Sequence, residues 1–174
     1  MPTGKATRPT SDRTREALFS TIESLVGPLP GLRVLDLYAG SGAFGLEALS
    51  RGAAHALMVD NDAKAGAVIR LNIAELGLPG AQVRCERVEH LATSAPHQPY
   101  DVVLADPPYA VDPAAVRELI GALVSAGWLA PEAIVAVERS SRDAAWSWPE
   151  GIEALRERRY GEGTLWYGRL VATG

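Results

Sequence analysis

The chain has 174 residues, which is long enough for one domain with a sizeable hydrophobic core. Apolar residues make up 47% of the chain and charged residues 22%, which is ordinary for a globular protein and excludes a low-complexity chain. The formal net charge of -4 gives no overall argument for a nucleic-acid partner.

The sequence gives little support for a disulfide bond, a metal site or a membrane-spanning segment. Cys85 is the only cysteine, so no internal disulfide can form, and a reducing cytoplasm fits this composition. Its apolar neighbours favour a place for Cys85 in the core. The three histidines share no metal-ligand spacing, and we find neither a signal peptide nor an apolar stretch that could span a membrane. We therefore expect a cytoplasmic protein with no metal and no membrane partner.

The N-terminal part is predicted to be a basic lead followed by a helix. Residues 1–9 form the lead, and a helix with several possible N-caps is expected over residues 10–26. Glycines and prolines in residues 27–31 end this helix. Basic residues gather here and again between residues 139 and 169, whereas residues 31–138 are acidic. This pattern is compatible with RNA bound at the ends and a cationic cofactor in the middle, but ordinary solvated surface gives it too.

A glycine-rich turn between a strand and a helix is the central motif. The predicted strand over residues 32–37 contains Asp36, and the Gly-Ser-Gly-Ala-Phe-Gly segment at 40–45 opens a helix that runs to about residue 51. Such turns cradle nucleotide-like ligands, although glycines also mark ordinary strand-to-helix turns. The Asp36 carboxylate would repel a pyrophosphate and attract an ammonium or a sulfonium. The motif therefore favours S-adenosylmethionine over NAD.

A second carboxylate follows the next strand. The strand over residues 55–60 ends at Asp60, about 20 residues after the glycine turn, where a carboxylate can accept both ribose hydroxyls. A helix over residues 62–76 and a third strand over residues 81–86 come next.

A second motif, Asp106-Pro107-Pro108-Tyr109, ends the fourth predicted strand, residues 100–105, and should face the same crevice. An exocyclic base amine is a poor nucleophile because its lone pair is delocalised into the ring. The Asp106 carboxylate and the Pro107 carbonyl could accept its two hydrogens and localise that pair, while Tyr109 stacks on the extruded base. A packed loop stiffened by prolines would explain the motif alone. Together with the glycine turn, it predicts methyl transfer to an amino group.

The remaining elements complete an α/β fold. A helix is expected over residues 113–126, a strand over 133–137, and an antiparallel hairpin over 152–160 and 164–172. Glu138 could border the site or lie on its rim. We expect a mostly parallel seven-stranded sheet with an antiparallel C-terminal strand and helices on both faces.

The motifs carry a family resemblance. The Asp-x-x-Ala-Gly-Ser-Gly pattern that starts at Asp36, the strand-end Asp60 and the Asp-Pro-Pro-Tyr segment resemble class I methyltransferases that act on an exocyclic nitrogen. With the Arg-Pro-Thr-Ser-Asp-Arg segment that starts at Arg8, nearly the whole chain resembles bacterial small-subunit (16S) ribosomal RNA guanine-N2 methyltransferases (RsmD type). The resemblance implies one Rossmann-like domain, with residues 1–30 as lead and helix and residues 31–174 as core.

The resemblance also implies the reaction and its partners. The methyl group of S-adenosyl-L-methionine would go to N2 of one guanine in 16S ribosomal RNA, leaving S-adenosyl-L-homocysteine. The partner would be the small ribosomal subunit or an assembly intermediate of it, and we expect the enzyme to be a monomer.

The implied site residues fall into three sets. The catalytic set is Asp106, Pro107, Pro108 and Tyr109. The cofactor set is Asp36, Tyr38, Ala39, Gly40, Ser41, Gly42, Asp60, Asn61, Arg87 and Val88. The RNA set is Arg8, Thr10, Arg13 and Arg15, for which a capped helix start with exposed arginines is an alternative explanation. Many methyltransferases have a polar acceptor where this chain has Arg87, so we expect the firmer adenine contact from the Val88 backbone.

Three other functions stay open. Asp-Pro-Pro-Tyr also serves adenine, so a DNA adenine-N6 methyltransferase is one alternative, although a chain of this length leaves little room for elements that read DNA grooves. An NAD(P)-dependent oxidoreductase could use the same glycine turn, but Asp36 argues against it. A non-catalytic assembly factor that binds RNA is the third.

Overall fold

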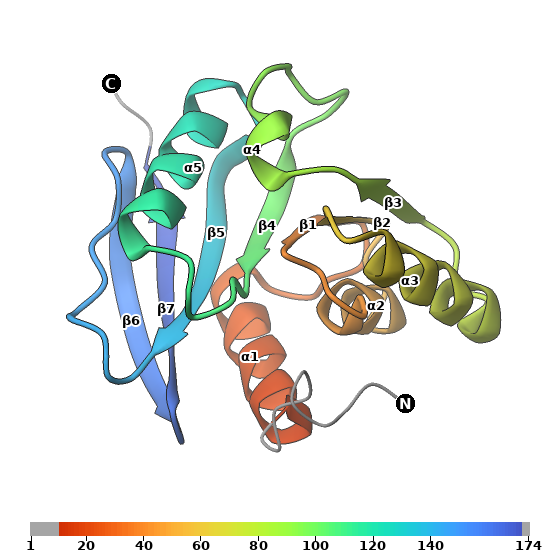
Figure 1. The fold of residues 1–174 in the computed structure, drawn as a ribbon, viewed down its shortest axis with the longest axis horizontal. Coiled ribbons are helices and arrows are strands. Elements are labelled where there is room, and N and C mark those ends of the chain that lie inside the picture. Colours follow the sequence, from red (N-terminus) through yellow and green to blue (C-terminus); the bar gives the residue numbers. More distant parts are fainter. Residues whose placement is uncertain (1–10, 172–174) are drawn as a thin grey trace.

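A seven-stranded sheet with the strand order β3-β2-β1-β4-β5-β7-β6 runs through the protein (Figure 1). The structure, a computed structural model, describes residues 11–171. In chain order the elements are α1 (Ser11–Val26), β1 (Arg33–Leu37), α2 (Ala43–Ser50), β2 (His55–Asp60), α3 (Ala63–Leu76), β3 (Ala81–Cys85), α4 (Val88–Leu91), β4 (Tyr100–Ala105), α5 (Pro113–Ser125), β5 (Leu129–Ser140), β6 (Ile152–Tyr160) and β7 (Gly163–Leu170).

Most neighbouring strands are parallel. β1 pairs with β2 and β4, β2 with β3, and β4 with β5, all in the same direction. Only β7 among the described strands is antiparallel, and it pairs with both β5 and β6. The predicted sheet is confirmed, and the structure adds that β7 lies beside β5 and leaves β6 at the edge.

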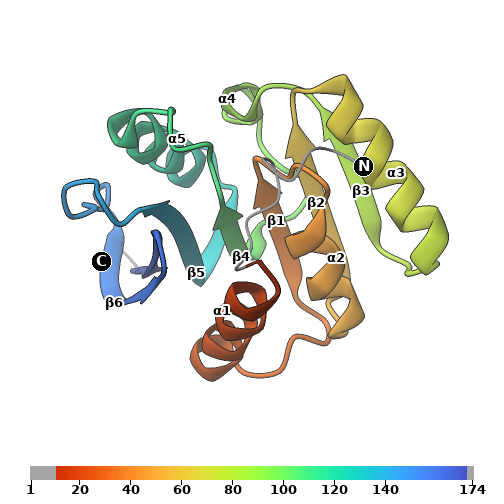
Figure 2. The ribbon, with the colours of Figure 1, turned by 60° about the horizontal axis from the view of Figure 1, so that its bottom comes forward.

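Helices cover both faces of the sheet, as expected from strands that are buried on both sides. α1, α2 and α3 pack on one face through a core that includes Phe19, Leu46 and Ile69. α4 and α5 pack on the other face through a core that includes Leu91 and Leu119. Figure 2 shows α4 and α5 on the opposite side of the sheet from α1 and α2.

The order of the strands places a crevice beside β1 and β4. From β1 the chain winds outward to β2 and β3, and from β4 it winds the other way to β5, so the two central strands form a topological switch point. In sheets of this kind, ligands bind at the carboxyl ends of the strands at that point. Leu37 of β1 pairs with Ala105 of β4 and with Val59 of β2. The residues that follow these strands therefore meet at one edge of the sheet.

Three features differ from the expectations. Strand β5 begins at Leu129 rather than at residue 133. Pro131 and Glu132, which has a φ of 65°, interrupt the apolar pattern from which the strand was predicted, but they do not end the strand. The short helix α4 was not expected. In addition, the prediction that Cys85 lies in the core is wrong, because it ends the edge strand β3 and is exposed.

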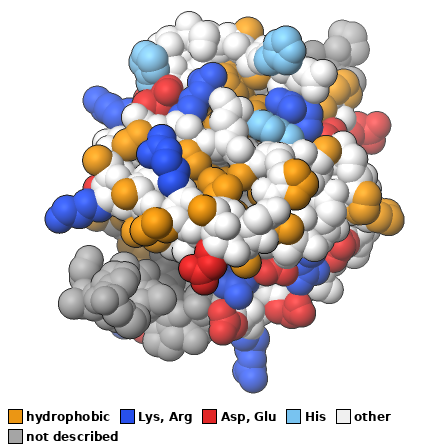
Figure 3. Space-filling view, turned by 90° about the vertical axis from the view of Figure 1, so that its right-hand side faces the viewer, with side chains coloured by type: hydrophobic (Ala, Val, Ile, Leu, Met, Phe, Trp, Pro, Cys, Tyr) orange, Lys and Arg blue, Asp and Glu red, His pale blue; other side chains and the backbone are white. Residues whose placement is uncertain are grey.

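The side of the molecule with α3 and β3 carries scattered apolar side chains among polar ones (Figure 3). Val68, Leu71 and Leu76 of α3 are exposed there. Within residues 11–171, no helix is both long and apolar enough to cross a membrane.

Candidate active site

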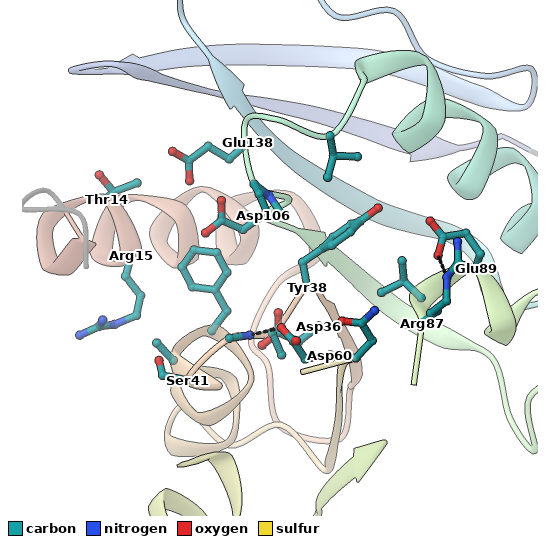
Figure 4. Close-up of a pocket in the computed structure, with 18 of the residues that line it drawn as sticks. Thr14, Arg15, Asp36, Tyr38, Ser41, Asp60, Arg87, Glu89, Asp106 and Glu138 are labelled. Carbon is teal, nitrogen blue, oxygen red and sulfur yellow. Dashed lines mark hydrogen bonds and ion pairs between the residues drawn. The ribbon is translucent and has the colours of Figure 1, made fainter. Parts of the chain in front are cut away.

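A pocket of about 920 Å³ opens at the carboxyl ends of β1, β2 and β4, beside the first turns of α1 (Figure 4). The strand-end carboxylates Asp36, Asp60 and Asp106 all line it. So do seven other residues of the predicted cofactor set, namely Tyr38, Ala39, Gly40, Ser41, Asn61, Arg87 and Val88. The two sequence motifs thus meet at one cavity.

The glycine turn is a tight loop tied to β2. Tyr38 and Gly40 both have a φ of 58°, a left-handed conformation that is uncommon for a residue with a side chain, and Gly42 has a φ of 83°. The Ala39 N–H donates to the Val59 carbonyl at 2.9 Å. Gly42 does not line the pocket but is the N-cap residue of α2, and a Cβ there would come within 3.1 Å of Met58 Sδ.

Asp36 is a buried carboxylate beneath this loop. It is 1% exposed, and its Oδ2 accepts a hydrogen bond from the Gly45 N–H at 2.9 Å. Burial raises the pKa of Asp36 well above its usual value, the Gly45 N–H partly opposes this, and Asp106 and Asp60 raise it further. A positively charged ligand in the pocket would favour the ionised form of this carboxyl group.

Asp60 holds the loop in place, a role that the sequence did not reveal. Its Oδ2 accepts the Gly40 N–H at 2.9 Å, and its Oδ1 accepts the Asp62 N–H at 2.9 Å. Each carboxylate oxygen has a second lone pair, so ribose hydroxyls can still bind Asp60. The neighbouring Asp62 caps α3, because its Oδ1 accepts the Lys64 N–H at 3.0 Å.

The far end of the pocket is formed by the start of α4. Val88 is buried there and lines the cavity. Arg87 also lines it, but its side chain is mostly exposed and forms an ion pair with Glu89 at 3.5 Å. This favours the Val88 position over the Arg87 side chain as a contact for an adenine ring.

The Asp-Pro-Pro-Tyr segment divides between the pocket and its rim. Asp106 and Pro108 line the cavity, whereas Pro107 is buried outside the lining. Tyr109 is 37% exposed, does not line the cavity, and its hydroxyl donates to Glu138 Oε2 at 3.2 Å. The Tyr109 ring is thus held beside the cavity mouth rather than inside it.

A buried arginine supports the backbone that follows this segment. Arg139 at the end of β5 is 2% exposed. Its Nη2 donates to the carbonyl oxygens of Val111 at 2.6 Å and Tyr109 at 3.2 Å, and its Nε lies 3.5 Å from Asp143 Oδ2. No sequence motif singled out this residue.

The predicted RNA residues are only partly described. Arg8 and Thr10 lie outside the described residues. Arg13 is exposed on α1, while Arg15 lines the pocket and forms ion pairs with Asp12 at 3.0 Å and Glu47 at 3.3 Å.

Seven lining residues were not in the predicted sets: Asp12, Thr14, Ala43, Phe44, Glu89, Val111 and Glu138. Phe44 lies inside the glycine motif and Glu89 beside Val88, so proximity to a motif could have indicated them. Thr14 lies between Arg13 and Arg15, and Val111 lies two residues after Tyr109, so these two are also close to predicted residues.

Comparison with known proteins identifies the family of this chain. A family model described as Conserved hypothetical protein 95 matches residues 1–169. Ribosomal RNA small subunit methyltransferase D of Escherichia coli K12 is 34% identical over 163 residues, which cover 93% of this chain and 79% of the relative. The chain belongs to the methyltransferase D family. The Haemophilus influenzae member is 31% identical over 88% of this chain and 78% of its own length.

A solved structure described as a putative methyltransferase shares the fold of this chain. The structure of yhhF from Escherichia coli matches 95% of this chain and 88% of its own length, with 32% identity and a TM-score of 0.84. The resemblance, the fold class and the assignment to methyltransferases are thus confirmed.

Proposed function

We propose that the protein transfers a methyl group from S-adenosylmethionine to the exocyclic N2 atom of a guanine in small-subunit ribosomal RNA. The observation that carries this proposal is the meeting of Asp36 and Asp106 at one pocket, at the ends of the paired strands β1 and β4. A buried carboxylate suits a cationic ligand, and a carboxylate before two prolines suits an amino group. The methyltransferase D relatives are named for action on ribosomal RNA of the small subunit.

The residues of the pocket fit S-adenosylmethionine. Asp36 offers negative charge in a buried site, where a cation would lower its raised pKa. The Tyr38 hydroxyl is buried and, within residues 11–171, has no hydrogen-bond partner, so it can meet a polar group of the ligand. Asp60 keeps lone pairs for the ribose, and Val88 borders the space for the adenine. When bound, S-adenosylmethionine supplies an electrophilic methyl group on a positively charged sulfur.

The Asp-Pro-Pro-Tyr segment prepares the amino group of the base. The Asp106 carboxylate and the Pro107 carbonyl accept the two N2 hydrogens, which localises the nitrogen lone pair. Neither proline has an N–H that could compete for these acceptors. Most of the rate enhancement comes from alignment of the amine. When the nitrogen gains the methyl group it loses a proton, and Asp106 or water accepts it.

The base must leave its stack to reach this pocket. Tyr109, at the cavity mouth, can stack on it with a contribution of roughly 1–3 kcal/mol, which offsets part of the few kcal/mol of extrusion. Arg13, together with Arg8 and Thr10, would contact the RNA. We infer that the target lies in an assembled or assembling small subunit, so the reaction takes place in the cytoplasm.

Two of the three alternative functions, the oxidoreductase and the DNA methyltransferase, explain the site less well. A dinucleotide would place a pyrophosphate beside Asp36, where like charges repel in a buried site. A DNA adenine enzyme would share the Asp-Pro-Pro-Tyr chemistry, but the relatives are named for ribosomal RNA.

Labelled methyl transfer tests the proposal. The protein is incubated with labelled donor and either undermethylated small subunits, naked 16S ribosomal RNA or plasmid DNA. We expect label on N2 of one guanine in ribosomal RNA, with small subunits as the better substrate. Label in DNA, or on another base atom, would overturn the proposal.

A further inference from the structure

Glu138 is a buried carboxylate in the pocket that the transfer described above does not use. It is 6% exposed and lies in the last part of β5. Ala105 of β4 pairs with Val137 of β5, so Asp106 and Glu138 follow at the same level of neighbouring strands. Both line the pocket, and in Figure 4 both carboxylates point toward its α1 side.

Tyr109 and Gly163 are two described neighbours of the Glu138 carboxylate. The Tyr109 hydroxyl donates to Glu138 Oε2 at 3.2 Å. Gly163 of β7 lies so close that a Cβ there would overlap Glu138 Oε2 and come within 2.9 Å of the Tyr109 hydroxyl. The glycine therefore leaves room for the carboxylate and the tyrosine to meet.

Asp106 and Glu138 together favour a base edge that donates hydrogen bonds from two neighbouring positions. Ionised carboxylates only accept hydrogen bonds. In guanine the N2 amino group lies beside N1–H, so two neighbouring positions donate. In adenine the amino group lies beside an N1 that accepts. Two neighbouring acceptors thus satisfy guanine, whereas they direct a negative charge at the N1 lone pair of adenine.

We propose that Glu138 accepts the N1–H of the target guanine and so selects it over bases whose N1 carries no hydrogen. The inference rests on the proposed function, because it requires an N2 amino group at Asp106. Asp-Pro-Pro-Tyr alone holds an amino group of either base, and Glu138 supplies the discrimination. Glu138 is a specificity residue that contacts the substrate, while Tyr109 and Gly163 position it.

The test compares guanine with 2-aminopurine, which keeps the N2 amino group but has an accepting N1. Ribosomal RNA with either base at the methylated position is assembled into small subunits, and kcat/KM of methyl transfer is measured. We expect the wild-type protein to prefer guanine by about tenfold or more, since a good base contact gives discrimination of this order. In Glu138→Gln, whose amide can donate to N1, this preference should shrink at least about fivefold. Glu162→Gln, an exposed acid in the neighbouring turn, is the matched control.

Binding gives a readout that does not depend on turnover. The affinities of the same two RNAs, measured with S-adenosylhomocysteine present, should show the same reduced preference in Glu138→Gln. Donor titration checks that the variant folds. If Glu138→Gln keeps the wild-type preference in both measurements, Glu138 does not read N1. If the wild-type protein methylates neither RNA, the proposed function itself fails.

Discussion

The Asp36 carboxylate and the Gly45 N–H are joined by a buried hydrogen bond of 2.9 Å that links the end of β1 to the first turn of α2. The bond requires a glycine, because a Cβ at position 45 would lie 2.6 Å from Met58 Cγ and 3.3 Å from Asp36 Oδ2. This hydrogen bond fixes the position of the Asp36 carboxylate beneath the proposed site of the donor.

Asp36→Asn should stabilise the protein and weaken donor binding. The pKa of Asp36 is higher in the folded protein than in the unfolded chain, where it lies near 3.8. Its stabilising contribution is complete below the unfolded value and is lost as pH rises through the folded value. At neutral pH the amide removes this cost and can still accept from Gly45, so we expect a gain of about 1 kcal/mol in the free energy of unfolding. Affinity for S-adenosylmethionine should fall at least about tenfold. Denaturant unfolding and calorimetry measure the two effects, and a less stable variant with unchanged affinity would contradict this account.

Donor affinity should depend on pH through the same residue. Below the raised pKa, Asp36 must lose a proton before it can attract the donor, so affinity should rise with pH and level off once Asp36 is ionised. The slope reaches at most about tenfold per pH unit, because one proton is released. Calorimetry from about pH 5 to about pH 8, in buffers of different ionisation enthalpy, measures affinity and proton release together. Asp36→Asn is the control, and an equal slope in it would assign the effect to another group.

Gly45→Ala should destabilise the protein by about 1–3 kcal/mol, because Met58 must leave its place in the core. Denaturant unfolding measures the loss. The matched control is Gly121→Ala in α5, where a Cβ would meet only Pro149 at 3.4 Å. This control should be neutral or more stable by about 0.5–1 kcal/mol. Equal effects of the two substitutions would show that Gly45 is not needed for a close approach.

Arg139→Met should slow turnover more than it weakens donor binding. The guanidinium holds the Tyr109 and Val111 carbonyl oxygens, so its loss frees the backbone after Asp106. A misplaced reacting group costs up to about a hundredfold in rate, and we expect kcat to fall at least about tenfold while the donor Kd changes little. Steady-state kinetics and calorimetry provide the two values. Arg142→Met, at an exposed arginine, should match the wild type, and parallel losses of kcat and donor affinity in Arg139→Met would show a general structural role instead.

The meeting of the strand-end carboxylates could be predicted from the sequence, because the topology of a parallel sheet brings such residues together. Asp36, Asp60 and Asp106 each end or follow an apolar run, and in a parallel sheet such ends share one edge. Their meeting at one pocket therefore needs no knowledge of distant contacts.

The contacts across the site could not be predicted in the same way. The Tyr109–Glu138 hydrogen bond and the support from Arg139 join residues about 30 positions apart, which no local pattern encodes. The exposure of Cys85 depends on β3 lying at the edge of the sheet, and strand order is not visible in an apolar run.

Methyl transfer requires that a donor at Asp36 and an amino group at Asp106 meet in one pocket. The kinetics of Asp106→Ala on small subunits, with donor affinity determined on the same preparation, test this requirement. We expect kcat to fall by roughly 10²–10⁴ while the donor Kd stays near the wild-type value. A variant as active as the wild-type protein would contradict it.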